Sequence, residues 1–191
     1  YENISGIGVD SGCYINGGYT TNYAGHITLK NFNAIGNNGI GISCNTVNAN
    51  MLVVDGYEVV HDGIVNTNAI RFSSTSSVRV LNAKGIVYDI NSGISSTTAV
   101  VTQNGTVDVI NLSESRIVSY TGNTVQGVTM NSGASTTEIN LRGVQCVTVG
   151  ANVAPVNLNS GIVGTPKVTI QGCAFSGAGG PGVQTSANCD V

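Results

Sequence analysis

Short apolar stretches alternate with small polar residues along nearly the whole chain, and residues 78–105 show the pattern most clearly. In the first stretch, Val78 and Val80 point to one side while Arg79 and Leu81 point to the other, which is the period-two pattern of a β-strand. Two further short apolar stretches follow, each closed by turn-forming residues. Three such strands bury too little apolar surface to be stable alone, so the unit is expected to stack on copies of itself.

Copies of this first strand recur along the chain at spacings of 24, 27, 29, 32 and 29 residues. Their alignment predicts two columns of inward residues, a column being the residues at the same position in successive coils. The first column is Ile27, Met51, Val78, Val107, Ile139 and Val168, and the second, two residues later, is Leu29, Val53, Val80, Val109, Leu141 and Ile170. Two residues further lies a column of turn formers: Asn31, Asp55, Asn82, Asn111, Gly143 and Gly172. Asn, Asp and Gly enter left-handed backbone conformations at low cost, and an Asn can also hydrogen-bond along the stack. This register predicts that Asn82→Leu harms folding more than Leu81→Asn.

The third strand of the unit repeats as well. Its predicted inward pairs are Ile40 and Ile42, Ile70 and Phe72, Val100 and Thr102, Val128 and Met130, Val156 and Leu158, and Val183 and Thr185. The chain is therefore predicted to be all-β: a single-stranded parallel β-helix of about seven coils, with three short strands per coil. A right-handed winding is expected because parallel crossovers are almost always right-handed.

Residues 1–191 are expected to form a single β-helix domain, with an irregular first coil at 1–25 and regular coils at 26–189. Solenoids normally close their core with a polar cap. Neither end of this sequence has the pattern of a cap, so we expect the chain to be a fragment of a longer one.

Composition narrows the possible partners. Only 9% of the residues are charged and the net charge is −3, without a basic stripe that would indicate nucleic acid. No apolar run approaches the roughly 20 residues of a membrane helix.

The five cysteines form no C-x-x-C pair and there are only two histidines, so neither a metal site nor a cofactor is expected. Reduced, buried thiols are the simplest interpretation, and they indicate folding in a reducing cytoplasm.

The repeated V-x-V/I-x-N strand, the brief second strand and the string V-x-L-N-S-G resemble the pectin-lyase-like right-handed parallel β-helix. Within that family, this Asn-rich, weakly charged version over residues 26–189 is similar to spike and fibre proteins of bacteriophage tails. The resemblance implies a homotrimer in the virion tail, folded in the host cytoplasm, that binds and often cleaves a bacterial surface polysaccharide. The catalytic strings of pectate lyases and polygalacturonases are absent, since the nearest match, Gly25-His26-Ile27, lacks its Asp partners.

Three functions remain open at this stage. The first is a tailspike or tail fibre segment that binds, and in one version depolymerises, a host surface polysaccharide as a glycoside hydrolase or polysaccharide lyase. The second is a structural shaft or adhesin-like β-helix without glycan contact. The third is a secreted polysaccharide lyase, which the missing catalytic strings disfavour.

The candidate catalytic residues are Asp62, Asp89 and Glu58. The alignment predicts that Asp62 lies over Asp89 and His61 over Tyr88, with Glu58 one turn away. Carboxylates on neighbouring coils would lie about 5 Å apart, as in a retaining glycosidase, or further apart, as in an inverting one. One of such a pair becomes the acid because their pKa values split. The alternative is that these Asp residues bond local backbone in turns.

The candidate glycan-binding residues are the rings near the second strand: His61, Tyr88, Tyr57 and Tyr120. Such rings could stack on sugars, or they could stack on one another within the protein. A separate outward row on the first strand is mixed and mostly small, which suits a wet interface between the subunits of a trimer. That row is Thr28, Leu52, Arg79, Asp108, Asn140 and Thr169.

Overall fold

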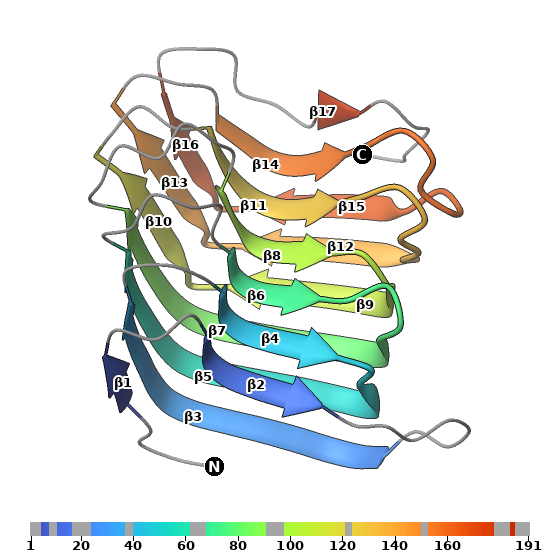
Figure 1. Ribbon diagram of the computed structural model, residues 1–191. Helices are drawn as coiled ribbons and strands as arrows, with labels where there is room; N and C mark the ends of the chain where they lie inside the picture. Colours follow the sequence, from blue (N-terminus) through green and yellow to red (C-terminus); the bar gives the residue numbers. More distant parts are fainter. Residues whose placement is uncertain are drawn as a thin grey trace.

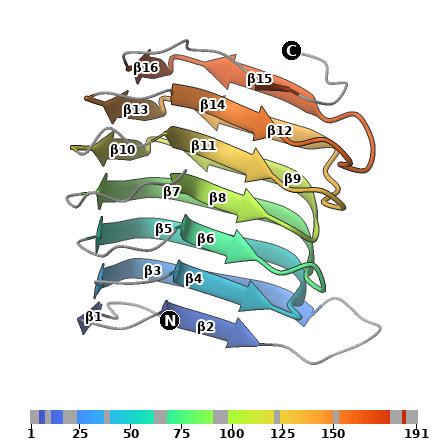
Figure 2. The same ribbon diagram turned by 45° about the horizontal axis from the view of Figure 1, so that its top comes forward.

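The computed structural model describes residues 5–7, 11–16, 24–36, 40–61, 68–90, 98–120, 124–149, 153–177 and 184–185. All regular elements in these ranges are β-strands, and all their pairings are parallel. The protein is an all-β parallel solenoid, which confirms the predicted fold class (Figures 1 and 2). In Figure 1 the chain crosses the front sheet from left to right, returns behind it and climbs, which is a right-handed winding.

One side of the solenoid is a seven-stranded sheet with the order β17-β14-β11-β8-β6-β4-β2. Its strands are β2 (Ser11–Asn16), β4 (Ile40–Asn45), β6 (Asn68–Phe72), β8 (Thr98–Gln103), β11 (Val125–Met130), β14 (Val153–Leu158) and β17 (Gln184–Thr185).

The rest of the wall is a bent ten-stranded sheet. Its strands are β1 (Ser5–Ile7), β3 (Ala24–Gly36), β5 (Asn48–His61), β7 (Ser77–Ile90), β9 (Thr106–Ser113), β10 (Arg116–Ser119), β12 (Glu138–Arg142), β13 (Gln145–Thr148), β15 (Lys167–Gln171) and β16 (Ala174–Ser176). We call the part before the bend the first arm and the part after it the second arm. Strands β3, β5 and β7 run through the bend, whereas later coils break there into β9 and β10, β12 and β13, and β15 and β16.

The predicted coil architecture therefore needs two corrections. Three separate strands per coil occur only from β9 onward, because the earlier coils use one long strand for both arms. Fewer than seven coils are described in full, since the first is represented by β1 and β2 and the last sheet strand, β17, holds two residues.

The bend between the arms is made by a column of left-handed residues. Its members all have positive φ: Asn31 (49°), Gly56 (71°), Gly85 (64°), Glu114 (48°), Gly143 (62°) and Gly172 (58°). Asn31, Gly143 and Gly172 were predicted for this column. Asp55, Asn82 and Asn111 were assigned to it wrongly, because they lie earlier on their strands, on the outer surface.

The register of the first arm differs from the prediction in the middle coils. The buried columns are Ile27, Leu52, Leu81, Ile110, Ile139 and Val168, then Leu29, Val54, Ala83, Leu112, Leu141 and Ile170. Strict alternation fails at Arg79 and Val80, which both face outward between buried Val78 and buried Leu81. After this irregularity, residues predicted to point outward, such as Leu81, point inward, and the residues between them point outward. Leu52, predicted for the outward row, is consequently part of the core.

The seven-stranded sheet keeps most of its predicted inward residues. Its two buried columns are Ile42, Ile70, Val101, Val128 and Val156, then Cys44, Phe72, Gln103, Met130 and Leu158. In β8, Thr102 was predicted to point inward, but it lies on the outer surface between Val101 and Gln103.

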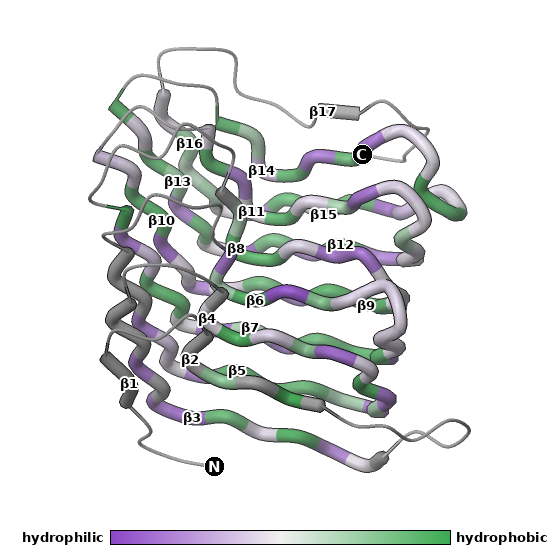
Figure 3. The backbone as a smooth tube through the Cα atoms, viewed as in Figure 1, coloured by the Kyte–Doolittle hydropathy of each residue, from purple (hydrophilic) through white to green (hydrophobic). Residues whose placement is uncertain are grey.

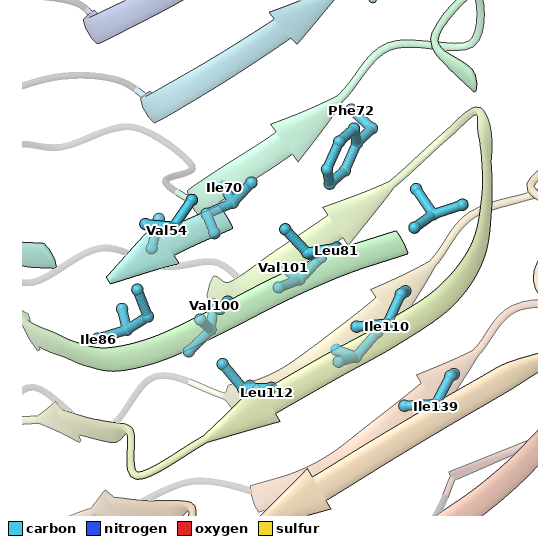
Figure 4. Packing of buried hydrophobic residues seen from close by; sticks show 14 of the residues in the cluster. Val54, Ile70, Phe72, Leu81, Ile86, Val100, Val101, Ile110, Leu112 and Ile139 are labelled. Atoms are coloured by element: carbon cyan, nitrogen blue, oxygen red, sulfur yellow. The ribbon is translucent and has the colours of Figure 1, made fainter. Parts of the chain in front are cut away.

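The interior is a continuous apolar core. Figure 4 shows labelled side chains from β5, β6, β7, β8, β9 and β12 pointing into one shared space, and Figure 3 shows hydrophobic and hydrophilic positions alternating along the strands. Full burial of each Val, Leu or Ile contributes about 1.5–3 kcal/mol. Gln103 is a polar member of one buried column, and its Nε2 donates to the carbonyl oxygens of Gly105 (3.1 Å) and Ser135 (2.5 Å). This side chain therefore fixes the turn that leads into the next coil.

Asparagine side chains connect the coils on the outside. On the first arm, Asn111 Nδ2 donates to Asn82 Oδ1 at 2.8 Å, and Asn140 Nδ2 donates to Asn111 Oδ1 at 3.0 Å. The prediction that Asn82 and Asn111 hydrogen-bond along the stack is confirmed, although Asn140 rather than Gly143 continues their column.

Four of the five cysteines lie in the described residues, and all four are free thiols. Cys44 and Cys146 are buried. Burial raises the pKa of the Cys146 thiol to about 12, with a smaller contribution from Cys173, and it raises the pKa of Cys44 further. These thiols are structural, since a neutral buried thiol is a poor nucleophile.

Replacing Leu81 with Asn should destabilise the protein far more than replacing Asn82 with Leu, the reverse of the ranking predicted from the sequence. Leu81 is 0% exposed, so Asn there leaves a cavity and an unpaired buried amide, at a cost of about 3–5 kcal/mol. The Asn82→Leu variant loses outer hydrogen bonds worth about 1 kcal/mol. Urea unfolding measures both values, and equal midpoints would contradict the observed register.

Native protein at pH 8 should resist alkylation at Cys44 and Cys146. Both thiols are buried and stay protonated at that pH because their pKa values are raised. Iodoacetamide labelling followed by peptide mass spectrometry should find both unmodified before denaturation and modified after it. Rapid labelling of either thiol in the native protein would show that the core opens at that coil.

Candidate functional site

An open groove crosses the outer surface of the seven-stranded sheet. It encloses about 320 Å³ and runs over β6, β8, β11 and β14. Its lining consists of Asn68, Ala99, Thr102, Gln126, Thr129, Asn131, Asn157 and Asn159. Every lining residue except Ala99 carries an amide or a hydroxyl, and none carries a charge. The groove is therefore suited to a ligand that is recognised by hydrogen bonds.

The strand pattern explains why these polar groups face outward. Thr102 and Thr129 occupy the same outward column, because each stands between two residues of the buried columns. Beside Thr129, a Cβ at Gly127 would lie 2.6 Å from the carbonyl oxygen of Pro155 on the next coil. Glycine is thus required here for close contact between coils.

Hydrogen bonds organise the floor of the groove. Thr102 Oγ1 donates to Asn68 Oδ1 at 2.5 Å, which links two coils. Thr129 Oγ1 donates to Gln126 Oε1 within one coil. Gln126 is only 2% exposed, so its amide is held in a recessed position at the bottom of the groove.

An asparagine ladder forms one wall. Asn159 Nδ2 donates to Asn131 Oδ1 at 2.8 Å, and Asn131 Nδ2 donates to Asn104 Oδ1 at 2.7 Å. The ladder ends where Asn104 Nδ2 donates to the carbonyl oxygen of Phe72 at 2.8 Å. These bonds fix the turn that follows each strand, so this wall is rigid.

The predicted catalytic residues lie elsewhere. Asp62 is outside the described residues. Glu58 and Asp89 lie on the outer surface of the second arm, where Glu58 aligns with Val87 and Asp89 with Val60. The two carboxylates are therefore diagonal neighbours, with Cα atoms roughly 7–8 Å apart.

The alignment of His61 over Tyr88 is wrong, because His61 aligns with Ile90. Asp89 lies on this arm between the buried residues Tyr88 and Ile90. Within the described part of the chain, its Oδ1 is buried and has no hydrogen-bond partner. Such an oxygen is costly, which makes Asp89 the stronger catalytic candidate of the two described carboxylates.

Two of the predicted glycan-binding rings cannot reach a glycan. Tyr57 and Tyr88 are buried in the core, 1% and 0% exposed, because the second arm turns both inward. Burial raises the pKa of the Tyr57 hydroxyl far above its usual range, and nearby Tyr88 and Cys13 add to the effect. Tyr120 is 52% exposed and stays a candidate. The structure describes the backbone of His61 but not its side chain.

A second depression, of about 270 Å³, lies on the outer surface of the first arm. Its lining is Val53, Asp55, Asn82, Ala83, Lys84, Asn111 and Ser113. Lys84 aligns with Asp55 on the neighbouring coil, and its Nζ lies 3.3 Å from Glu114 Oε2. The lining itself therefore carries one negative and one positive charge, those of Asp55 and Lys84.

Within the described ranges, no three His, Cys, Asp or Glu residues come together in a way that could hold a metal ion. The same ranges contain no helix of the length and apolarity needed to cross a membrane.

No protein-family model matches this chain, and no curated protein or solved structure matches it either. The β-solenoid fold is established by the strand pairing of this structure itself.

The groove was not predicted from the sequence, although the sequence contains a pattern that indicates it. The predicted inward pairs Val128 with Met130 and Val156 with Leu158 already leave Thr129 and Asn157 pointing outward. Thr102 belongs to the same column but had been assigned to the core. Reading the outward columns for neutral polar side chains, rather than only for carboxylates and rings, would have found the groove.

If the protein cleaves glycan, Asp89→Asn and Glu58→Gln should each lower turnover by roughly a hundredfold or more, the scale of general acid–base catalysis. Both changes are close in size and should leave the fold intact. Release of reducing ends from a bound polysaccharide measures turnover, with circular dichroism as the folding control. Full activity in both variants would remove these two carboxylates from the mechanism.

Proposed function

We propose that this chain is a glycan-binding β-helix, specifically a segment of a bacteriophage tailspike or tail fibre that attaches to a host surface polysaccharide. The observation that carries the proposal is the uncharged groove of amides and hydroxyls on the seven-stranded sheet. The bacteriophage origin, the homotrimer and the location in the virion tail are supported by the sequence resemblance alone.

The chemistry of the groove fits a polyhydroxylated polymer. Amides and hydroxyls donate and accept hydrogen bonds, as sugar hydroxyls do. Adjacent strands lie about 4.8 Å apart, so a repeating polymer along the solenoid axis meets similar groups on successive coils. Thr102, Thr129 and Asn157 are such a series. Because the side chains stand on hydrogen-bonded strands, little freedom is lost when a ligand binds.

Binding without cleavage is the version of this function that the geometry favours. No carboxylate lines the groove, and Glu58 and Asp89 belong to the second arm of the other sheet. A hydrolase or lyase activity would therefore need a separate site on that arm.

A structural shaft without glycan contact is the second candidate. Two observations favour it: Tyr57 and Tyr88 pack in the core instead of facing a ligand, and the asparagine ladders connect successive coils. Both features stabilise the solenoid without requiring a ligand.

Replacing Thr129 with Val should weaken binding to a cognate bacterial surface polysaccharide by about fivefold, the effect of one lost hydrogen bond of about 1 kcal/mol. Thr169→Val is the matched control, because Thr169 lies on β15 in the first arm, away from the groove. Purified capsule and lipopolysaccharide glycans immobilised on a sensor surface provide the measurement.

Equal losses in the two variants would move the binding site off the groove. Failure of the wild-type protein to bind any glycan of such a panel would favour the structural shaft.

A further inference from the structure

The amide nitrogens and the amide oxygens of the groove differ in how far they are already hydrogen-bonded within the protein. Asn68 Oδ1 and Gln126 Oε1 already accept from Thr102 and Thr129, whose hydroxyl protons are used in these bonds. Across the described residues, neither the amide nitrogen of Asn68 nor that of Gln126 has a hydrogen-bond partner. The floor therefore presents unused N–H groups, while each of its amide oxygens already accepts one hydrogen bond.

The ladder wall has the same bias. The amide oxygens of Asn131 and Asn159 accept from Asn159 and Asn157, at 2.8 and 3.5 Å. Each ladder nitrogen uses one hydrogen for the stack and keeps a second one for a ligand. Among the amide oxygens of the described lining, Asn157 Oδ1 alone accepts no hydrogen bond from the protein. On both sides of the groove the amide nitrogens thus keep unused hydrogens, whereas every amide oxygen of the described lining except that of Asn157 already accepts one hydrogen bond.

Charge reinforces this bias. No Asp or Glu lines the groove, and the exposed Arg71 aligns with Thr102 in the neighbouring coil. A guanidinium therefore stands beside the β6 end of the groove. It has five N–H donors and no acceptor.

We propose that the groove selects sugars bearing a carbonyl or carboxylate oxygen over sugars that bear hydroxyls alone, an inference that rests on the proposed glycan-binding function. A sugar hydroxyl brings a proton that must itself find an acceptor, and four of the five amide oxygens of the lining already accept one hydrogen bond. A carbonyl or carboxylate oxygen only accepts, so it matches the free N–H groups of Asn68 and Gln126. The shared chemistry is an acceptor oxygen, carried by an acetamido group or by a uronate.

Calorimetric titration of the full 191-residue chain with three hexasaccharides tests the selectivity. The probes are an isomalto-oligosaccharide with hydroxyls only, chitohexaose with acetamido groups, and hexagalacturonate with carboxylates. At least one of the last two should bind tenfold or more tightly than the first. Salt separates the two sources, because binding of the carboxylate probe should weaken with ionic strength and binding of the acetamido probe should not.

Gln126→Glu tests the donor directly. Glu keeps an oxygen for the Thr129 hydroxyl but replaces the free N–H group by a second oxygen, so affinity for the preferred probe should fall tenfold or more. Gln145→Glu is the matched control, since Gln145 is exposed on β13 in the second arm. If Gln126→Glu unfolds the protein, Asn68→Asp makes the same change at a half-buried position.

Equal affinity for the three probes, or unchanged affinity in both groove variants, would overturn the selectivity while leaving glycan binding intact. If no probe binds but a bacterial polysaccharide does, the proposal requires that this polymer carry acetyl or carboxylate groups, and a hydroxyl-only polymer would refute it. If no glycan of either set binds the wild-type protein, the proposed function itself fails.

Discussion

In-register stacking of parallel coils is the constraint on which the other features of this protein depend. From Asn48 with Ser77 to His61 with Ile90, β5 and β7 place each residue beside its equivalent one coil away. Side chains of one column are then about 4.8 Å apart, so each column repeats its own chemistry. Apolar columns build a continuous core, amide columns hydrogen-bond along the axis, and columns of like charge are disfavoured. The 9% of charged residues reflects this limit.

The same stacking decides which residues shape the wall. The bend between the arms needs a left-handed backbone in every coil, and the column from Asn31 to Gly172 supplies it mostly with glycine. Glu114 adopts the conformation as well, although it has a Cβ and therefore incurs strain. Neighbouring coils hold it in place, since its N–H donates to the carbonyl oxygen of Arg142 at 2.9 Å.

The outer surfaces of the solenoid differ in chemistry although they share one scaffold. The first arm carries an asparagine ladder and offsetting charges, the second arm carries Asp89 with its buried oxygen, and the seven-stranded sheet carries a neutral groove. The groove gathers side chains from four neighbouring strands around one open space. Recognition by a rigid, uncharged array of this kind depends first on matching donors and acceptors.

The sequence by itself determined the parallel solenoid, most of the buried residues of the seven-stranded sheet and three members of the bend, because a pattern repeated over successive coils outweighs irregularities in any one of them. The tertiary structure decided which way particular side chains point. Two consecutive outward residues, Arg79 and Val80, exchange the inner and outer positions that follow, and Leu81 consequently enters the core while Asn82 faces solvent. The groove also required the structure, since its lining comes from strands about one coil apart, and a single-residue shift in register moves a side chain to the opposite face of the sheet.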